Sequence, residues 1–246
     1  MSDLRPVARE FRSAILAAAA DATRSELDAG TLIVAPPNRA GSAAAVAYCF
    51  GDLTIAWCDP VLRDRVAPLG DEAALDHDAF VAAAAELGGR HHGSGYHRVL
   101  DGPPARVDAA LPTMRWLATS DASDLALLQA FVDASSEDDL DEAELDMDEL
   151  DEHIVVSLDG DGTITSYASG RPFDLAAAFD DIAVITHPDH RGKRLGAVVV
   201  GEYCRVRQPA GRRMFYSCAA ENLGSSAVAE RLGFELVADV VAMTFD

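Results

Sequence analysis

The sequence contains only one lysine, Lys193, and its acidic residues outnumber its basic residues 41 to 20. The formal net charge of −21 argues against a nucleic acid as partner, because phosphate backbones are bound mainly by Lys and Arg. No apolar stretch is long enough to span a membrane, and the N-terminus lacks the pattern of a secretory signal. We therefore expect a cytoplasmic protein with no membrane segment.

Cysteine is also scarce, and its spacing excludes the usual metal sites. The four cysteines form no CxxC pair and have no histidine at ligand spacing, so we expect no bound metal. Each lies in an apolar segment, which favours reduced, buried thiols. Cys49 and Cys58 flank a predicted hairpin turn, and a disulfide between them is the less favoured alternative.

The sequence divides into two halves at a segment rich in proline and glycine, 101–112. Before it, the pattern predicts a helix over 3–29, a strand over 31–37, a hairpin over 43–59, helices near 60–69 and 76–88, and a strand over 95–100. After it, a strand, a helix, an acidic stretch, a hairpin, two strand–helix pairs and a closing strand follow. We predict an α/β domain over 1–104 and an α+β domain over 112–246, the latter built on a mixed, mostly antiparallel sheet flanked by helices.

Residues 182–197 carry the clearest functional pattern. The apolar run 182–186 predicts a buried strand, Pro188 ends it, and residues 195–207 have helical spacing. The N–H groups of a helix N-terminus have no intrahelical acceptor, and the helix dipole is positive there. A strand, a glycine-containing turn and a helix N-terminus in this order therefore predict a phosphate site.

This segment and a second one resemble the GNAT superfamily of acyl-CoA-dependent N-acetyltransferases. The family's phosphate loop, Arg/Gln-x-x-Gly-x-Gly/Ala, stands here as Arg191–Ala197 after a His-Pro pair. The second motif, Asn-x-x-Ser followed by Leu-Gly-Phe, stands here as Asn222–Ser225 and 232–234. The resemblance covers about 115–246 and is closest to a subgroup with an extra N-terminal half. Residues 90–95 also match the loop pattern, but we interpret that match as chance because a strand follows it.

The resemblance implies that acetyl-CoA is the co-substrate and a primary amine is the acceptor. It also implies that the strand pairs its backbone with pantetheine and supplies an N–H that polarises the thioester carbonyl. The cofactor-binding residues would then be Val184, Ile185, Thr186, Arg191, Gly192, Lys193, Arg194, Leu195, Gly196, Ala197, Asn222 and Ser225. Two residues depart from the family: Arg194 replaces the middle glycine, and Ala229 stands where many members carry a tyrosine proposed to protonate the leaving thiolate.

The candidates for a general base are Asp181, Asp180 and Glu221. The two aspartates open the strand 182–186, and Glu221 precedes Asn222. The alternative for the two aspartates is a structural role at the solvent-exposed end of a strand, and this alternative is slightly favoured. His187 and His190 are more simply explained as solvated loop residues, and Tyr203 and Tyr216 as packing residues.

The stretch 133–152 holds twelve acidic residues and no basic residue. It could attract a cationic acceptor amine. The slightly favoured alternative is a solvated, mobile acidic lid whose like charges resist helix formation. For the N-terminal half we expect a role in completing the acceptor cleft or a homodimer interface. The main alternative to an enzyme is a catalytically silent acyl-CoA-binding module that regulates a partner.

Overall fold

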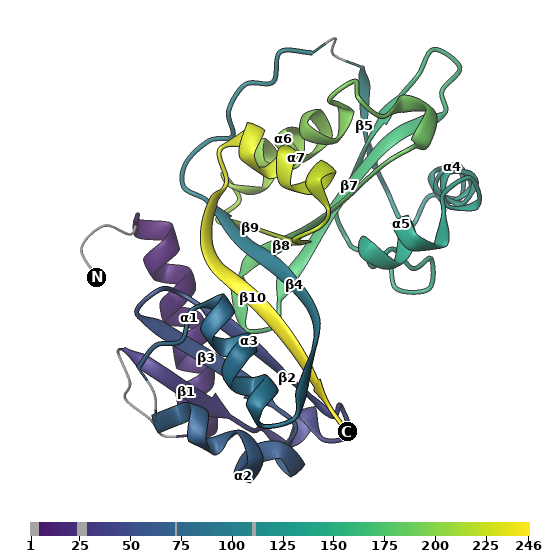
Figure 1. Cartoon of the computed structure of the whole chain (residues 1–246). Coiled ribbons are helices and arrows are strands. Elements are labelled where there is room, and N and C mark those ends of the chain that lie inside the picture. Colours follow the sequence, from purple (N-terminus) through teal and green to yellow (C-terminus); the bar gives the residue numbers. More distant parts are fainter. Residues whose placement is uncertain (1–4, 24–28, 72, 110–111) are drawn as a thin grey trace. The chain divides into compact units, whose positions relative to one another are not determined.

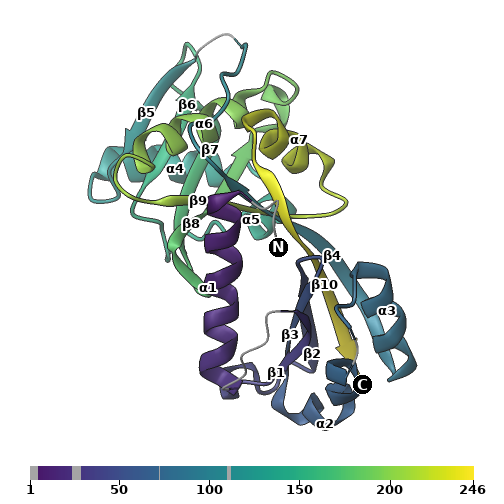
Figure 2. The same cartoon turned by 90° about the vertical axis from the view of Figure 1, so that its left-hand side faces the viewer.

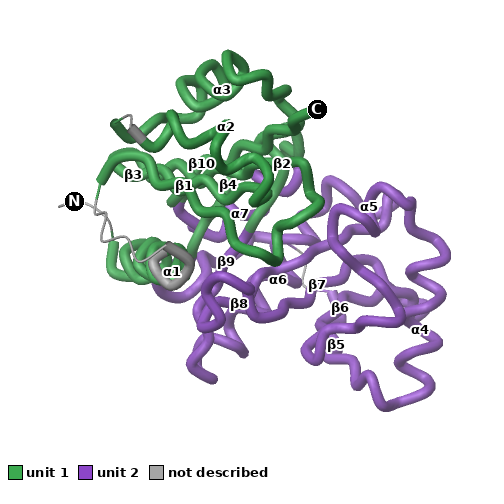
Figure 3. The backbone as a smooth tube through the Cα atoms, turned by 90° about the horizontal axis from the view of Figure 1, so that it is seen from below, with its two compact units in different colours: residues 1–99, 217–223, 236–246 green, residues 100–216, 224–235 purple. Residues whose placement is uncertain are grey.

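The computed structural model describes residues 5–23, 29–71, 73–109 and 112–246. The predicted helix end over 24–28 and residues 110–111 of the predicted linker lie outside the described residues. The described chain forms two compact units (Figure 3), one of residues 1–99, 217–223 and 236–246 and the other of residues 100–216 and 224–235. These units differ from the contiguous ranges 1–104 and 112–246 that we expected, because the end of the chain returns to the first unit.

Unit 1 holds most of the elements of the N-terminal half together with the last strand (Figure 1). Its helices are α1 (Pro6–Thr23), α2 (Arg63–Val66) and α3 (His77–Glu86), and its strands are β1 (Gly30–Val34), β2 (Ala44–Cys49), β3 (Leu53–Cys58), β4 (Gly89–Leu100) and β10 (Glu235–Phe245). The strand order is β1-β3-β2-β10-β4. The predicted hairpin over 43–59 is confirmed as the antiparallel pair β2–β3, whereas β1 runs parallel to β3.

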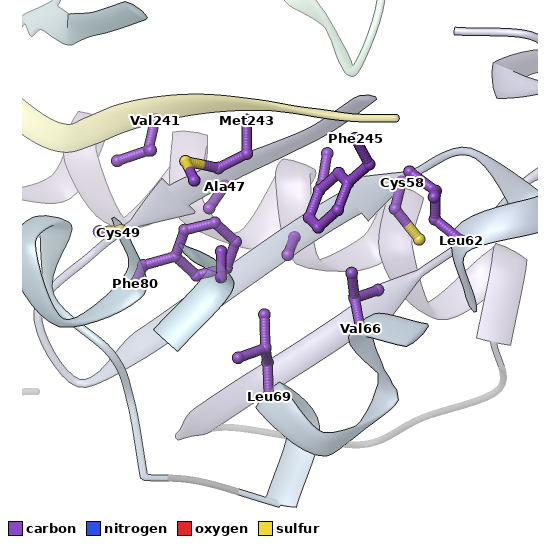
Figure 4. Packing of buried hydrophobic residues seen from close by; sticks show 13 residues of the cluster. Ala47, Cys49, Cys58, Leu62, Val66, Leu69, Phe80, Val241, Met243 and Phe245 are labelled. Atoms are coloured by element: carbon purple, nitrogen blue, oxygen red, sulfur yellow. The ribbon is translucent and has the colours of Figure 1, made fainter. Parts of the chain in front are cut away.

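Strand β10 accounts for the difference between these units and the expected ranges at the C-terminus. It pairs antiparallel with β2, from Asp239↔Cys49 to Thr244↔Ala44. Its inward side chains, Val241, Met243 and Phe245, pack in one cluster with Phe80 of α3 and with residues of β2 and β3 (Figure 4). The core of the N-terminal unit is therefore completed by the last residues of the sequence.

The two faces of this sheet are covered by different helices. In Figure 2, α1 lies on one side of the strands and α2 and α3 lie on the other. On the α1 face, Phe11 meets His97 edge-on at 6.1 Å between ring centroids, and Tyr48 lies 5.0 Å from the same His97. Burial lowers the pKa of His97 to about 3, so this histidine is neutral and acts as a packing residue.

Unit 2 holds the elements of the predicted functional segment. Its strands are β5 (Thr113–Leu117), β6 (Ile154–Leu158), β7 (Ile164–Phe173), β8 (Ala176–Thr186) and β9 (Arg213–Ala219), and its helices are α4 (Ala122–Asp133), α5 (Glu137–Glu142), α6 (Leu195–Arg207) and α7 (Leu223–Leu232). The order is β9-β8-β7-β6-β5, with β8 parallel to β9 and antiparallel to β7. The prediction of an α+β fold on a mixed, mostly antiparallel sheet is confirmed.

The expectation that like charges keep the segment 133–152 from forming a helix is wrong, whereas its role as a mobile lid stays a prediction. Residues 137–142 form α5, whose N-cap hydroxyl of Ser136 accepts the N–H of Asp139 at 3.2 Å. Ala143 and Leu145 are buried in a cluster with Phe131, Tyr167 and other residues of α4 and the sheet. Apolar side chains between the acidic residues therefore anchor the segment, and most of the acidic side chains are exposed, although Asp139 and Asp151 are half-buried.

The four cysteines are free, as expected. Cys49, Cys58 and Cys204 are buried, whereas Cys218 is only half-buried, which corrects the expectation for that thiol. Burial raises the pKa of the Cys49 thiol to about 12, so it is not a reactive thiolate.

Because β10 completes unit 1, Met243→Ala should destabilise a unit formed mainly by residues more than 140 positions earlier. Met243 is fully buried, and truncating such a residue typically costs about 2–5 kcal/mol. Denaturant unfolding measures the change. Val61→Ala is the control, because Val61 is 79% exposed and should change the free energy of unfolding by less than about 0.5 kcal/mol. Equal effects of the two variants would contradict this description of the core.

Candidate functional site: a strand that diverges into a glycine loop

Strands β8 and β9 run side by side for only a short distance. Their recorded pairs are Phe179↔Arg213, Asp180↔Met214 and Asp181↔Phe215, and β8 continues to Thr186. On its other edge β8 stays paired with β7 as far as Thr186↔Ser166. From Ile182 onward, β8 thus stays paired with β7 but no longer pairs with β9.

The backbone of this segment alternates between the two edges. The N–H of His187 donates to Thr165 O at 3.0 Å, so residues of the same parity, including Ile185, bond toward β7. Val184 and Thr186 have the opposite parity and direct their N–H and C=O groups toward the side where β9 diverges. An extended ligand could pair with these groups as a neighbouring strand would, apart from Thr186 O, which accepts Arg191 Nε at 3.1 Å. Of the predicted strand residues, Val184 and Thr186 are therefore better placed than Ile185.

A short loop connects β8 to the N-terminus of α6. Gly192 has φ +77° and Arg194, the N-cap of α6, has φ +65°. The first helical hydrogen bond of α6 runs from Val198 N to Arg194 O at 3.1 Å, so the N–H groups of 195–197 precede it. Strand, turn and helix thus occur in the order that the sequence predicts.

Gly196 lies where α6 packs closely against β8 and α7. A Cβ atom at this position would lie 3.2 Å from Thr186 Oγ1, 3.4 Å from Val228 Cγ2 and 3.5 Å from Val184 Cγ2. The first of these contacts is tighter than ordinary packing allows. Glycine at 196 therefore lets the first turn of α6 lie directly against the diverging segment of β8.

The three cationic side chains of the loop all contact acceptors within unit 2. Arg191 donates through one nitrogen to both carboxylate oxygens of Asp139, at 2.6 and 2.7 Å, and through Nε to Thr186 O at 3.1 Å. Lys193 donates to Asp189 O at 3.2 Å, and Arg194 to Asp108 O at 2.5 Å. Asp139 is a site residue that the sequence did not reveal, because nothing local links α5 to a loop 52 residues later.

Asp180 is held by a network of basic and hydroxyl groups. It is 1% exposed and accepts from Arg212 Nε at 2.7 Å, Arg207 Nε at 3.2 Å and the hydroxyl of Tyr203 at 3.0 Å. Burial and the neighbouring Asp180 charge raise the pKa of Tyr203, so its hydroxyl is a poor proton donor. These contacts favour a structural role for both residues.

Asp181 lies on the opposite face of β8, because side chains alternate along a strand. It shares that face with Ala183 and Ile185, which pack in the cluster that includes Leu145 of the acidic segment. Asp181 is only half-buried. Of the two adjacent aspartates it is therefore the one placed on the side of α4 and α5.

The second predicted motif is divided between the units. Glu221 and Asn222 belong to unit 1, where Asn222 N donates to Ala219 O at 3.1 Å. Ser225 belongs to unit 2, and its hydroxyl lies 2.8 Å from the Tyr216 hydroxyl. Ala229 is fully buried in α7. Roles for Glu221 and Asn222 beside the loop stay predictions.

The other loop-like match in the sequence does not form a loop. Residues 90–95 lie inside strand β4, so they have no helix N-terminus after them. No group of three or more His, Cys, Asp or Glu side chains within the described residues could hold a metal ion. None of the described helices is both long and apolar enough to cross a membrane.

Part of the chain matches a known protein family. Residues 116–234 match the Acetyltransferase (GNAT) family. The C-terminal half of the chain contains a GNAT acetyltransferase domain. No curated protein matches the chain in sequence.

Solved structures of GNAT proteins resemble the chain at low sequence identity. An acetyltransferase from the GNAT family of Colwellia psychrerythraea is 15% identical with a TM-score of 0.51, covering 69% of this chain and 63% of that one. A tandem GNAT protein from the clavulanic acid biosynthesis pathway is 20% identical, with a TM-score of 0.46 and coverage of 69% and 58%. A phosphinothricin acetyltransferase of Sinorhizobium meliloti, in complex with AcCoA, is 21% identical, with a TM-score of 0.40 and coverage of 53% and 85%. The chain thus spans less than two thirds of the first and second of these proteins.

Because Arg194 adopts a left-handed conformation, Arg194→Gly should be more stable than Arg194→Ala by about 1 kcal/mol. Both variants lose the contact with Asp108 O, so their difference isolates the backbone cost at φ +65°. Thermal or urea unfolding of the two variants side by side measures it. An Arg194→Ala variant as stable as Arg194→Gly would show that the loop does not hold this conformation in solution.

Proposed function

We propose that the GNAT domain transfers an acetyl group from acetyl-CoA directly to a primary amine. The observation that carries this proposal is the departure of β8 from its ladder with β9, immediately before the glycine loop and α6. The diverging edge suits the amide groups of pantetheine, and the N–H groups of 195–197 suit the pyrophosphate. The bound AcCoA in the Sinorhizobium structure is an observation on that protein and not on this chain.

In this proposal the amine nitrogen attacks the thioester carbon, the C–S bond breaks and the amine loses a proton to a base. The N–H of Val184 would polarise the carbonyl, since it is directed to the diverging edge. Asp181 is the favoured base among the three candidates because it is half-buried on the face of α4 and α5, whereas Asp180 is 1% exposed. With alanine at 229, the thiolate leaves without a tyrosine at that position and would take its proton from solvent.

The second candidate function is an acyl-CoA-binding module without catalysis, and Ala229 is the observation that favours it. Purified protein mixed with acetyl-CoA and a panel of primary amines distinguishes the two through release of free thiol. Turnover on any amine supports the enzyme, whereas CoA binding without turnover supports the silent module. The cytoplasmic location and a homodimer stay predictions from the sequence.

Saturating acetyl-CoA should raise the melting temperature of the wild-type protein, since a ligand at 100 times its Kd stabilises by about 2.7 kcal/mol. Gly196→Val should abolish this rise, because its side chain would collide with Thr186 and Val228. Gly196→Ala, with a smaller clash, should weaken it. Gly160→Val is the control, because a Cβ at Gly160 meets nothing within 4 Å. A normal rise in folded Gly196→Val would contradict the placement of the donor site.

Asp181→Asn should lower kcat about 10²- to 10⁴-fold if Asp181 is the general base. The melting-temperature rise with acetyl-CoA should stay unchanged, because the carboxylate is assigned to the acceptor side. Glu221→Gln, measured in parallel, tests the remaining candidate. An Asp181→Asn enzyme with wild-type kcat would remove Asp181 from the mechanism while leaving the donor site intact.

A further inference from the structure

Unit 1 contains a cavity of about 410 Å³ at the N-terminus of α3, and none of its lining residues is among those assigned to acetyl-CoA. It lies between the start of α3, strand β4 and strand β10. Its lining includes Asp76, His77, Asp78, Ser94, Tyr96 and Asp239. All of these residues belong to one compact unit, so the cavity is formed by a single folded body.

A chain of short hydrogen bonds crosses the cavity wall. Ser94 Oγ lies 2.7 Å from His77 Nε2, and His77 Nδ1 lies 2.8 Å from Asp78 Oδ1. A carboxylate can only accept, so the neutral His77 ring carries its proton on Nδ1 and leaves Nε2 as an acceptor. The Ser94 hydroxyl therefore donates to His77 Nε2.

A second histidine completes the environment of the serine. His91 Nε2 lies 2.9 Å from Ser94 Oγ. Because the hydroxyl proton already points at His77, the bond with His91 is made by an N–H of His91 to the serine oxygen. Serine, base and carboxylate thus share the donor–acceptor order of an activated nucleophile.

The serine and its base are held by regular structure. Ser94 belongs to β4, and its carbonyl accepts the N–H of Ala220 at 2.9 Å. Next to it, a Cβ on Gly95 would lie 2.9 Å from Cys218 O, so the backbones touch there. On the other side, Asp76 caps α3 by accepting Ala79 N at 2.9 Å, which fixes the start of the helix that carries His77.

We propose that Ser94 is the nucleophile of a second, hydrolytic site that cleaves small carboxylic esters. Ser94 Oγ attacks the ester carbonyl carbon, and its proton passes to His77 Nε2. The bond from that carbon to the alcohol oxygen breaks, and His77 returns the proton to the leaving alcohol. Water, deprotonated by the same histidine, then cleaves the acyl-serine to the carboxylic acid and free Ser94.

Two features of the cavity define the substrate further. The N–H groups of His77 and Asp78 lie in the first turn of α3 and have no acceptor within the helix, so they suit the developing oxyanion. Asp76, Asp78 and Asp239 contribute negative charge, and no Lys or Arg is among the lining residues. The preferred ester therefore carries a positive charge.

His77 and Asp78 should contribute unequally to the rate of hydrolysis. The side chain of Asp78 is 98% exposed, whereas that of His77 is 33% exposed. A fully solvated carboxylate interacts weakly with the imidazole, because water screens it. His77 should therefore contribute far more to the rate than Asp78.

The test uses the full chain with 4-nitrophenyl acetate and with acetylthiocholine as neutral and cationic probes. Hydrolysis should fall at least 100-fold in Ser94→Ala and in His77→Gln, and less than 10-fold in Asp78→Asn. His92→Ala is the control, since His92 is an exposed histidine of the same strand outside the cavity lining. Asp239→Asn should reduce the preference for acetylthiocholine.

A fluorophosphonate probe followed by peptide mass spectrometry gives an independent readout. The label should appear on Ser94 and be lost in His77→Gln, while the melting-temperature rise with acetyl-CoA stays at the wild-type value. Wild-type hydrolysis rates in Ser94→Ala, absence of any ester hydrolysis by the wild-type protein, or labelling at another residue would each overturn the proposal.

Discussion

A single buried carboxylate holds together the part of unit 2 in which β8 diverges from β9. Asp180 in β8 bonds Arg207 and Tyr203 of α6 and Arg212 immediately before β9. It pairs with Met214 just before the two strands separate. Without this network, β8 and β9 could shift along one another near the point where they separate. The charged groups around Asp180 therefore fix where the two strands separate. Removing one partner of such a buried network typically costs about 3–5 kcal/mol.

The same network explains why two adjacent aspartates are not equivalent. Alternation along β8 turns Asp180 toward the basic groups of α6 and Asp181 toward the face of α4 and α5. The sequence shows only that both open the strand. Their division into a structural and a candidate catalytic residue depends on which helices cover each face, and that information comes from distant parts of the chain.

Local pattern was sufficient for the strand, loop and helix over 182–197, because proline, glycine and helical spacing act within a few residues. It was also sufficient for the hairpin over 43–59. It failed where partners lie far apart in sequence. The pairing of β10 with β2, the contact of Arg191 with Asp139 and the burial of Leu145 among acidic residues all depend on tertiary packing. For 133–152, charge dominated the prediction, whereas the apolar side chains between the charges decided the outcome.

The return of β10 to unit 1 has a consequence for how the protein is made. During synthesis, residues 1–99 leave the ribosome without the strand that pairs with β2 and covers their core. Unit 2 needs nothing later than residue 235, so it can complete its fold first, although it begins at residue 100. The N-terminal unit then closes after unit 2, when β10 arrives, and until that moment the edge of β2 and its apolar face stay open to chaperones or to neighbouring chains.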